Sequence, residues 1–524
     1  MVALGVLVAA MVSGLAACTP PKPVPLEPAA LLSRISSRSL DDAAVVAALQ
    51  SQRLVSENGA GPRRWDLDAM TVAAWALRSE LAVTAARERV AAASVVEARQ
   101  FPNPVLSLTP ELITNAATGT SPWTAAVLLT WLIRAPGARA AAIDQARAAS
   151  EGAVWDGMTG AWDIRSQVRS AMLDLVLAQR SVALADEELG LRRQAVEMAQ
   201  TRVRVGAWEQ PELDRAGAEQ LAAQNESASA SAAAHAAMLR VASATGLTGE
   251  AALPATLVLP KLDDMPKVLA SVRVPDRDAV VLNRLDVARA LADYRGADAA
   301  WRAQVARRFP DLGAGPGYTY DKGDHKIVVT LSGEVPLLHT NSAAEATADA
   351  RRREAAAAVE VVQQTALAQF DRAGAAVAAA AERLAGAQRV VAARRSAVAA
   401  QRKRQLSGAG DRSDVVAREL ELLAARRSEL EALRATVDAL SEFETSVQRP
   451  LWPPSKLDVR REQAPDRAAR AGATDTSALD TRRGEQTPDR AAGAAATGDL
   501  QKISASQRTR HEPAMSSPAK ESLP

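Results

Sequence analysis

The chain has 524 residues, of which 48% are hydrophobic and only 3% aromatic, and much of the hydrophobic share is alanine. Alanine favours helix but fills little core volume, so this composition favours a long, thin assembly over one large globular core. The 63 basic and 61 acidic residues give a formal charge of +2, which offers no basis for binding nucleic acid by bulk electrostatics.

The first eighteen residues combine a short apolar stretch with a cysteine. Met1 to Leu15 is too short to span a bilayer as a permanent helix. It ends in Leu15-Ala16-Ala17-Cys18, which resembles the lipobox of bacterial lipoproteins, where the cysteine becomes the lipidated first residue. We therefore expect residues 1–18 to be a lipoprotein signal peptide and Cys18 to carry the lipid, palmitate included.

Two features qualify this interpretation of the N-terminus. No Lys or Arg precedes the apolar stretch, which favours a true translation start upstream of Met1. The alternative is an ordinary secretory signal whose cysteine is accidental. Cys18 is the only cysteine in the chain, so no intrachain disulfide can form.

Two polar segments flank the central part of the chain. Residues 19–62 contain several prolines and are expected to form a flexible tether. Residues 455–524 carry mixed charges with few large apolar side chains. Such a segment cannot bury enough apolar surface to offset its ordering entropy, so we expect a disordered C-terminal tail.

Between these ends, one pattern occurs twice. The segment from Ala98 to Pro102 matches the segment from Ala306 to Pro310, and Gly206 with Glu212-Leu213 matches Gly408 with Asp414-Val415 at the same internal spacing. The sequence thus predicts a first repeat at 63–250, a linker at 251–275 and a second repeat at 276–454.

Each repeat is expected to contain a helix, two strands, a long helix and a shorter return helix. Proline and glycine punctuate these elements. In the first repeat they are a helix from Asp66 to Gln100, strands Val105–Ile113 and Trp123–Ile133, a helix from Ala138 to Val205, and a return helix from Pro211 to Thr245. In the second they are a helix ending at Arg308, strands Leu312–Tyr320 and Lys326–Val335, and two helices that reach about Val447.

The strand candidates alternate in side-chain character and are about ten residues long, which suits tilted membrane-spanning strands. A soluble hairpin packed on helices would alternate equally well, so the pattern leaves both readings open. Four strands cannot close a barrel around a water-filled lumen, and an unpaired edge cannot face lipid. If the strands cross the membrane, several subunits must share the barrel.

The long helix of the first repeat carries two apolar series with a period of seven. The first is Val168, Leu175, Val182, Leu189, Val196 and Val203, and the second is Leu177, Leu184, Leu191, Met198 and Val205. The series lie about 200° apart around a helix, which predicts neighbours on both flanks, as in the wall of a tube. The later long helix carries one series: Phe370, Val377, Leu384, Val391 and Val398. A helix of about 65 residues spans about 100 Å, and a free coiled coil is the alternative explanation.

The duplicated pattern, with Phe101-Pro102-Asn103-Pro104 and Phe309-Pro310-Asp311-Leu312 opening the two hairpins, resembles the outer membrane efflux proteins related to TolC. Gly206 and Gly408, each six residues before an acidic-apolar pair, resemble that family's helical tips. The resemblance implies a mainly α protein with transmembrane β-strands. It also implies a homotrimer in which a twelve-strand β-barrel continues into a long α-helical barrel.

The same resemblance implies a passive duct in the bacterial outer membrane, lipid-anchored, with its helical part in the periplasm. Its partners would be a periplasmic adaptor, an inner-membrane pump of the RND type and outer membrane lipid. The cargo would be small molecules or metal cations. Pro136-Gly137-Ala138-Arg139 and the segment 336–341 look like the branch that exports heavy-metal cations. Ala138 and Leu285 depart from the family's usual basic residue and proline, which leaves the branch open.

Two other functions remain compatible with the sequence: a structural periplasmic coiled-coil spacer, and the outer component of a type I protein secretion system. An enzyme is not expected, because no nucleophile motif or phosphate-binding glycine loop is present. The four histidines, His235, His325, His339 and His511, show no metal-ligand spacing. We therefore predict no catalytic, metal or cofactor site.

Glu212 and Asp414 are the candidate gate residues, together with the tip glycines Gly206 and Gly408. The resemblance implies that Asp414 lines the constricted end of the tunnel. Ala417 stands where a second aspartate is usual, so the full double ring is in doubt. The alternative for both carboxylates is ordinary helix chemistry, since acidic residues in a first turn favour the helix dipole.

Overall fold

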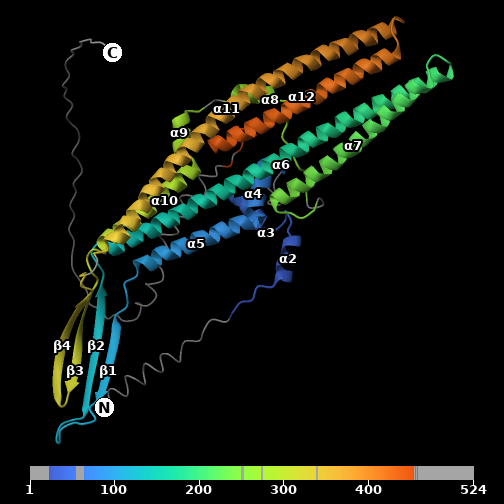
Figure 1. The fold of residues 1–524 in the computed structure, drawn as a ribbon. Helices are drawn as coiled ribbons and strands as arrows, with labels where there is room; N and C mark the ends of the chain where they lie inside the picture. The colour runs from blue at the N-terminus through green and yellow to red at the C-terminus, as the bar shows by residue number, and fades with distance from the viewer. Residues whose placement is uncertain are drawn as a thin grey trace, which may run out of the picture. The chain divides into compact units, whose positions relative to one another are not determined.

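The computed structural model describes residues 23–54, 64–249, 253–272, 275–337 and 340–453, together with 455 and 457 (Figure 1). Cys18 and the signal segment, the tail from 458, His339 and His511 lie outside the described residues. The elements up to the end of the first repeat are α2 (Pro28–Ser36), α3 (Ala43–Ser51), α4 (Leu67–Leu77), α5 (Ser79–Arg99), β1 (Val105–Leu112), β2 (Trp123–Ile133), α6 (Ala138–Arg204) and α7 (Gln210–Thr245). The remainder are α8 (Met265–Ser271), α9 (Arg277–Leu282), α10 (Leu285–Ala306), β3 (Leu312–Asp321), β4 (Asp324–Gly333), α11 (Ser342–Leu406) and α12 (Arg412–Val447).

The four strands form one antiparallel sheet in the order β1-β2-β3-β4, and the β2–β3 pairing joins the two repeats. Val127 of β2 lies opposite Leu108 of β1 and Tyr318 of β3. The predicted strands are confirmed: β2 has the expected bounds, and the other three differ from expectation by two residues or fewer at each end.

The long helices α6 and α11 contain 67 and 65 residues, so each spans about 100 Å. Both begin after a residue in the left-handed conformation, Gly137 with φ 84° and Asn341 with φ 61°. Each is followed by a turn at a glycine, Gly206 or Gly408, and by an antiparallel return helix (Figure 1). Among the described residues, no helix is both long and apolar enough to cross a membrane.

The two apolar series of α6 pack on opposite flanks, as their spacing predicts. Leu175 of the first series lies in a core cluster with Ala237 and Val241 of α7. Leu177 of the second lies in a cluster with Leu433 and Leu440 of α12. Helix α6 is therefore held between α7 and α12, which accounts for two stripes on one helix.

The helix expected from Asp66 to Gln100 is wrong in one respect, because it is broken in two at Arg78. The backbone of Arg78 is extended (φ −75°, ψ 125°) and separates α4 from α5. Helix α4 is buried along almost its whole length, whereas α5 has no buried residue. The break thus separates a helix inside the core from one that lies along α6.

The stretch expected as a tether, 19–62, contains two helices within its described part. Val45 and Leu49 of α3 are fully buried and belong to the same core cluster as α4. Burial of these side chains fastens α3 to the first repeat.

Candidate functional site

The sheet has two chemically different faces, and the strand register shows which residues lie on each face. One face is apolar along most of all four strands, and its apolar members are Leu106, Leu108, Pro110, Leu112, Trp123, Ala125, Val127, Leu129, Trp131, Ile133, Leu312, Ala314, Pro316, Tyr318, Tyr320, Ile327, Val329 and Leu331. Gly333 and the polar His325 of β4 also lie on this face. The opposite face carries most of the polar side chains, such as Thr109, Thr130, Thr319 and Lys326. Opposed residues of paired strands point to the same side, so each face is continuous across the sheet.

The apolar face is open to the surroundings. Ile327 and Val329 are 88% and 81% exposed, and no described helix packs across either face of the sheet. A soluble hairpin would bury such a face against its own helices. An uncovered apolar face backed by a polar one is the arrangement of a barrel wall between lipid and a watery lumen.

Three glycines, Gly313, Gly315 and Gly317, occupy alternate positions on the polar face of β3. A Cβ at Gly315 would lie 1.7 Å from the carbonyl oxygen of Leu129 on β2. No side chain fits there, so this glycine lets β2 and β3 approach closely.

The elements form layers with two open edges. In the sheet, the edge strands are β1 and β4. In the helices next to it, neighbours follow the order α5–α6–α10–α11, and farther along they follow α7–α6–α12–α11. Within the described part of the chain, one edge always comes from the first repeat (β1, α5 or α7) and the other from the second (β4 or α11).

At the tips, the structure gives Gly206 and Gly408 equivalent geometry. Their φ angles are 72° and 77°, and the amide of the following alanine donates to the carbonyl five residues earlier, at 2.9 Å for Ala207 and 3.0 Å for Ala409. This is the 6→1 hydrogen bond of a left-handed helix end, which favours glycine. The sequence match between the two turns therefore reflects the same backbone conformation.

The two candidate gate carboxylates have different local roles. Glu212 lies in the first turn of α7, just after Pro211. Asp414 is the third residue of α12 and forms a capping box with Asp411, accepting from the Asp411 amide at 3.4 Å. Both line one hollow of about 420 Å³ beside Trp208, so the fold brings them together.

Sequence reasoning missed Arg202, which joins the tips of the two repeats. Its guanidinium forms an ion pair with Asp411, donates to Ser413 Oγ at 3.2 Å, and stacks on Trp208 with Cζ 4.5 Å from the ring centroid. The spacing of Asp411 and Asp414 could have indicated the capping box. Nothing local indicates that Arg202 reaches a residue more than two hundred positions away.

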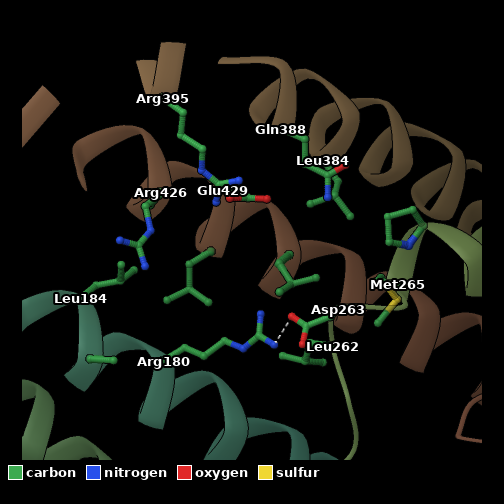
Figure 2. Close-up of a pocket in the computed structure, with 14 residues that line it drawn as sticks. Arg180, Leu184, Leu262, Asp263, Met265, Leu384, Gln388, Arg395, Arg426 and Glu429 are labelled. Atoms are coloured by element: carbon green, nitrogen blue, oxygen red, sulfur yellow. Dashed lines mark hydrogen bonds and ion pairs between the residues drawn. The ribbon is translucent and has the colours of Figure 1, made fainter. Parts of the chain in front are cut away.

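A second hollow, of about 400 Å³, lies where the linker crosses the seam between α6, α11 and α12 (Figure 2). Its floor consists of buried apolar side chains: Leu184, Leu262, Met265, Leu384 and Leu433. Arg180, Arg395 and Arg426 stand around it, and Arg180 pairs with Asp263 of the linker at 2.6 Å. Figure 2 shows the side chain of Arg395 extending toward Glu429. The linker is thereby fastened to both repeats.

Chemistry-bearing clusters are sparse in the described ranges. No group of three or more His, Cys, Asp or Glu side chains there could hold a metal ion. Of the described histidines, His325 bonds the hydroxyl of Tyr318 through Nδ1, beside Tyr320 in the sheet.

A sheet with one exposed apolar face, continued by long helices in open-edged layers, defines the wall of a membrane channel. The comparison with protein families identifies which channel: the model for outer membrane efflux proteins matches residues 72–247 and 278–446, and the chain belongs to this family. The family comprises channels, not enzymes, and its members are outer membrane components of tripartite efflux systems. A comparison with curated protein sequences gave no match.

Solved structures share the fold at low sequence identity. CusC, described for the conformational changes that accompany folding and transmembrane channel formation, is 18% identical, with a TM-score of 0.61 over 76% of this chain and 96% of that one. VceC of Vibrio cholerae is 18% identical, with a TM-score of 0.59 over 74% and 96%. CmeC of Campylobacter jejuni is 12% identical, with a TM-score of 0.61 over 87% and 97%.

Proposed function

We propose that three copies of this chain form one duct, the outer membrane part of a tripartite efflux system that exports small molecules or metal cations. The observation that carries the proposal is the pair of unlike edges in every layer. An edge of the first repeat meeting an edge of the second gives a head-to-tail interface, the kind of interface from which closed rings are built. Three copies with four strands each supply a twelve-strand barrel.

The edges carry apolar side chains that a neighbouring copy would cover. Val361 and Val390 of α11 and Leu221 of α7 are all more than half exposed. In contrast, the apolar series of α11 that faces α12, from Phe370 to Val398, is buried except for the partly buried Val377. One flank of α11 is thus buried against α12, whereas the opposite flank leaves apolar side chains exposed that a second copy would bury.

The partners proposed are a periplasmic adaptor and an inner-membrane pump of the RND type. The family relationship supports a tripartite assembly, and the motifs at 136–139 and 336–341 favour metal cations as cargo. A periplasmic coiled-coil spacer would not need an exposed apolar sheet face, so this face argues against that alternative.

A gate at the tips and a lipid anchor complete the proposal. Three copies would bring three Asp414 carboxylates to one end of the tunnel, and close like charges in a narrow passage attract cations. Glu212, which lines the same hollow, would add to this field. Cys18 would carry the lipid, and comparing palmitate labelling of the native and Cys18→Ser chains tests that anchor.

The oligomeric state and the conductance of the native full chain test the duct. Purified in detergent, the protein should have three times the mass of one processed chain and should open water-filled channels in planar bilayers. A stable monomer with full helix content, or a trimer that conducts no ions, would overturn the proposal.

A further inference from the structure

Three charged side chains are buried together where α6 meets the end of α12. Arg165 and Arg169 of α6 are 0% and 3% exposed, and Glu444 of α12 is 2% exposed. One oxygen of Glu444 pairs with Arg165 Nη1. The other accepts from the amides of Leu451 and Trp452 at 3.0 and 3.2 Å and lies 3.6 Å from Arg169 Nε.

The cluster holds more positive than negative charge. Arg169 also donates to the carbonyl of Trp452 and to Ser441 Oγ, both at 2.7 Å, but these partners are neutral. Burial lowers the pKa of Arg169, yet a guanidinium stays protonated at physiological pH. Two buried cations therefore face one buried anion, and an uncompensated buried charge is strongly disfavoured.

Several donors of this cluster lack an acceptor among the described residues. They are Nε and Nη2 of Arg165, Nη2 of Arg169 and the indole Nε1 of Trp162. Nε and Nη2 form the side edge of a guanidinium, whose two parallel N–H groups suit an anion. Trp162, Arg165 and Arg169 are spaced i, i+3 and i+7, so they share one face of α6.

We propose that this cluster binds a small monovalent inorganic anion of the chloride class, held mainly by the side edge of Arg165. Such an ion would accept from Nε and Nη2 of Arg165 and balance the excess charge, whereas a water molecule would supply no charge. The donor atoms are buried within one chain, so a side chain of a partner protein cannot reach them. The bound ion would fasten the end of α12 and residues 451–452 to α6. The inference does not depend on the duct function.

Thermal unfolding of the assembled full-length protein tests the site. At constant ionic strength, the Tm should rise with chloride or bromide concentration and stay unchanged when the larger gluconate replaces them. Arg165→Gln leaves Arg169 and Glu444 as a balanced pair, so its Tm should not respond to chloride. The matched control is Arg193→Gln, an exposed arginine of the same helix, which should respond as the native chain does. Equal Tm values of the native protein in chloride and gluconate would overturn the proposal.

Bromide diffraction decides the question even if Arg165→Gln fails to fold. Crystals of the native protein in bromide should show an anomalous peak within hydrogen-bond distance of Arg165 Nε and Nη2. The absence of a peak at that place would overturn the inference. A peak that forms only at molar bromide would mean an adventitious ion only, and would overturn it as well.

Discussion

Arg78 and Arg284, 206 residues apart, make the same set of contacts in the two repeats. Arg78 donates to Gln167 of α6 at 2.6 Å and to the carbonyl of Ala244, near the end of α7, at 3.3 Å. Arg284 donates to Gln369 of α11 at 3.0 Å and to the carbonyl of Ser446, near the end of α12, at 2.7 Å. Each also pairs with the carboxylate two residues later, Glu80 or Asp286.

A further hydrogen bond fixes the start of α10 next to Arg284. The amide of Leu285 donates to Gln448 Oε1 at 2.7 Å. A proline has no amide hydrogen and could not make this bond. This bond therefore depends on a residue other than proline at position 285.

The first prediction concerns Arg284, which is almost fully buried. Arg284→Ala should lower the free energy of unfolding by about 2–3 kcal/mol, because it leaves a backbone carbonyl and a carboxylate without their charged donor. Denaturation followed by circular dichroism at 222 nm measures this. Arg277→Ala, which breaks an exposed pair with Asp371, should cost clearly less, because solvent screens an exposed ion pair. Equal losses in the two variants would show that burial of Arg284 contributes nothing.

The Arg78–Glu80 pair should make stability depend on pH. The hydrogen bond from Arg78 holds the pKa of Glu80 below its ordinary value of 4.5. A lowered carboxyl pKa stabilises the folded chain above 4.5, and this contribution is lost as pH falls through the folded-state value. The stability difference between the native chain and Glu80→Gln should therefore shrink in unfolding curves as the pH is lowered from 4.5 through the folded-state pKa. A difference that stays constant over this range would contradict the assignment.

Gly315→Ala should prevent the sheet from forming normally. The added carbon would meet the carbonyl oxygen of Leu129, which is backbone and cannot move aside. We expect loss of the assembled oligomer on gel filtration and loss of conductance in planar bilayers. Gly190→Ala is the matched control, since it lies in α6 with open space around it. Its assembly should equal that of the native chain, and normal assembly of Gly315→Ala would refute the close approach.

Val390→Asp should separate assembly from folding. Val390 is 51% exposed on the open flank of α11, so a charge there is tolerated in one chain but is costly at an interface with a second copy. Gel filtration should show monomers with native helix content. Leu384→Asp, at a position 2% exposed on the other flank of α11, should instead lose helix content. If Val390→Asp still forms trimers, this flank of α11 is not part of the interface between copies.

Asp414→Asn separates the two roles of this side chain. Asparagine keeps an oxygen that can accept from the Asp411 amide but removes the charge. We expect unchanged stability, with lower cation selectivity and weaker block by divalent cations in single-channel recordings. Unchanged selectivity and block would reduce Asp414 to a residue that caps α12.

The sequence alone determined the four strands and the long helices of the two repeats, and where most of them end. Strand alternation, heptad spacing and proline or glycine at the boundaries are local properties of the chain, so β2 and the two flanks of α6 could be predicted. The break at Arg78 could not, because no proline or glycine marks it. Its contact with Ala244 lies 166 residues along the chain.

Only the tertiary structure decided which face of the sheet is apolar and which partners the charged residues contact. Within β2, Leu128 and Leu132 lie on the mixed face with Thr124 and Thr130, so one strand leaves the choice ambiguous, and the register with three other strands resolves it. Arg165 and Glu444 are 279 residues apart in sequence, yet they form one buried cluster. Burial removes the solvent that would screen such charges, and which residues are buried follows from packing between elements rather than from the order of residues along any one of them.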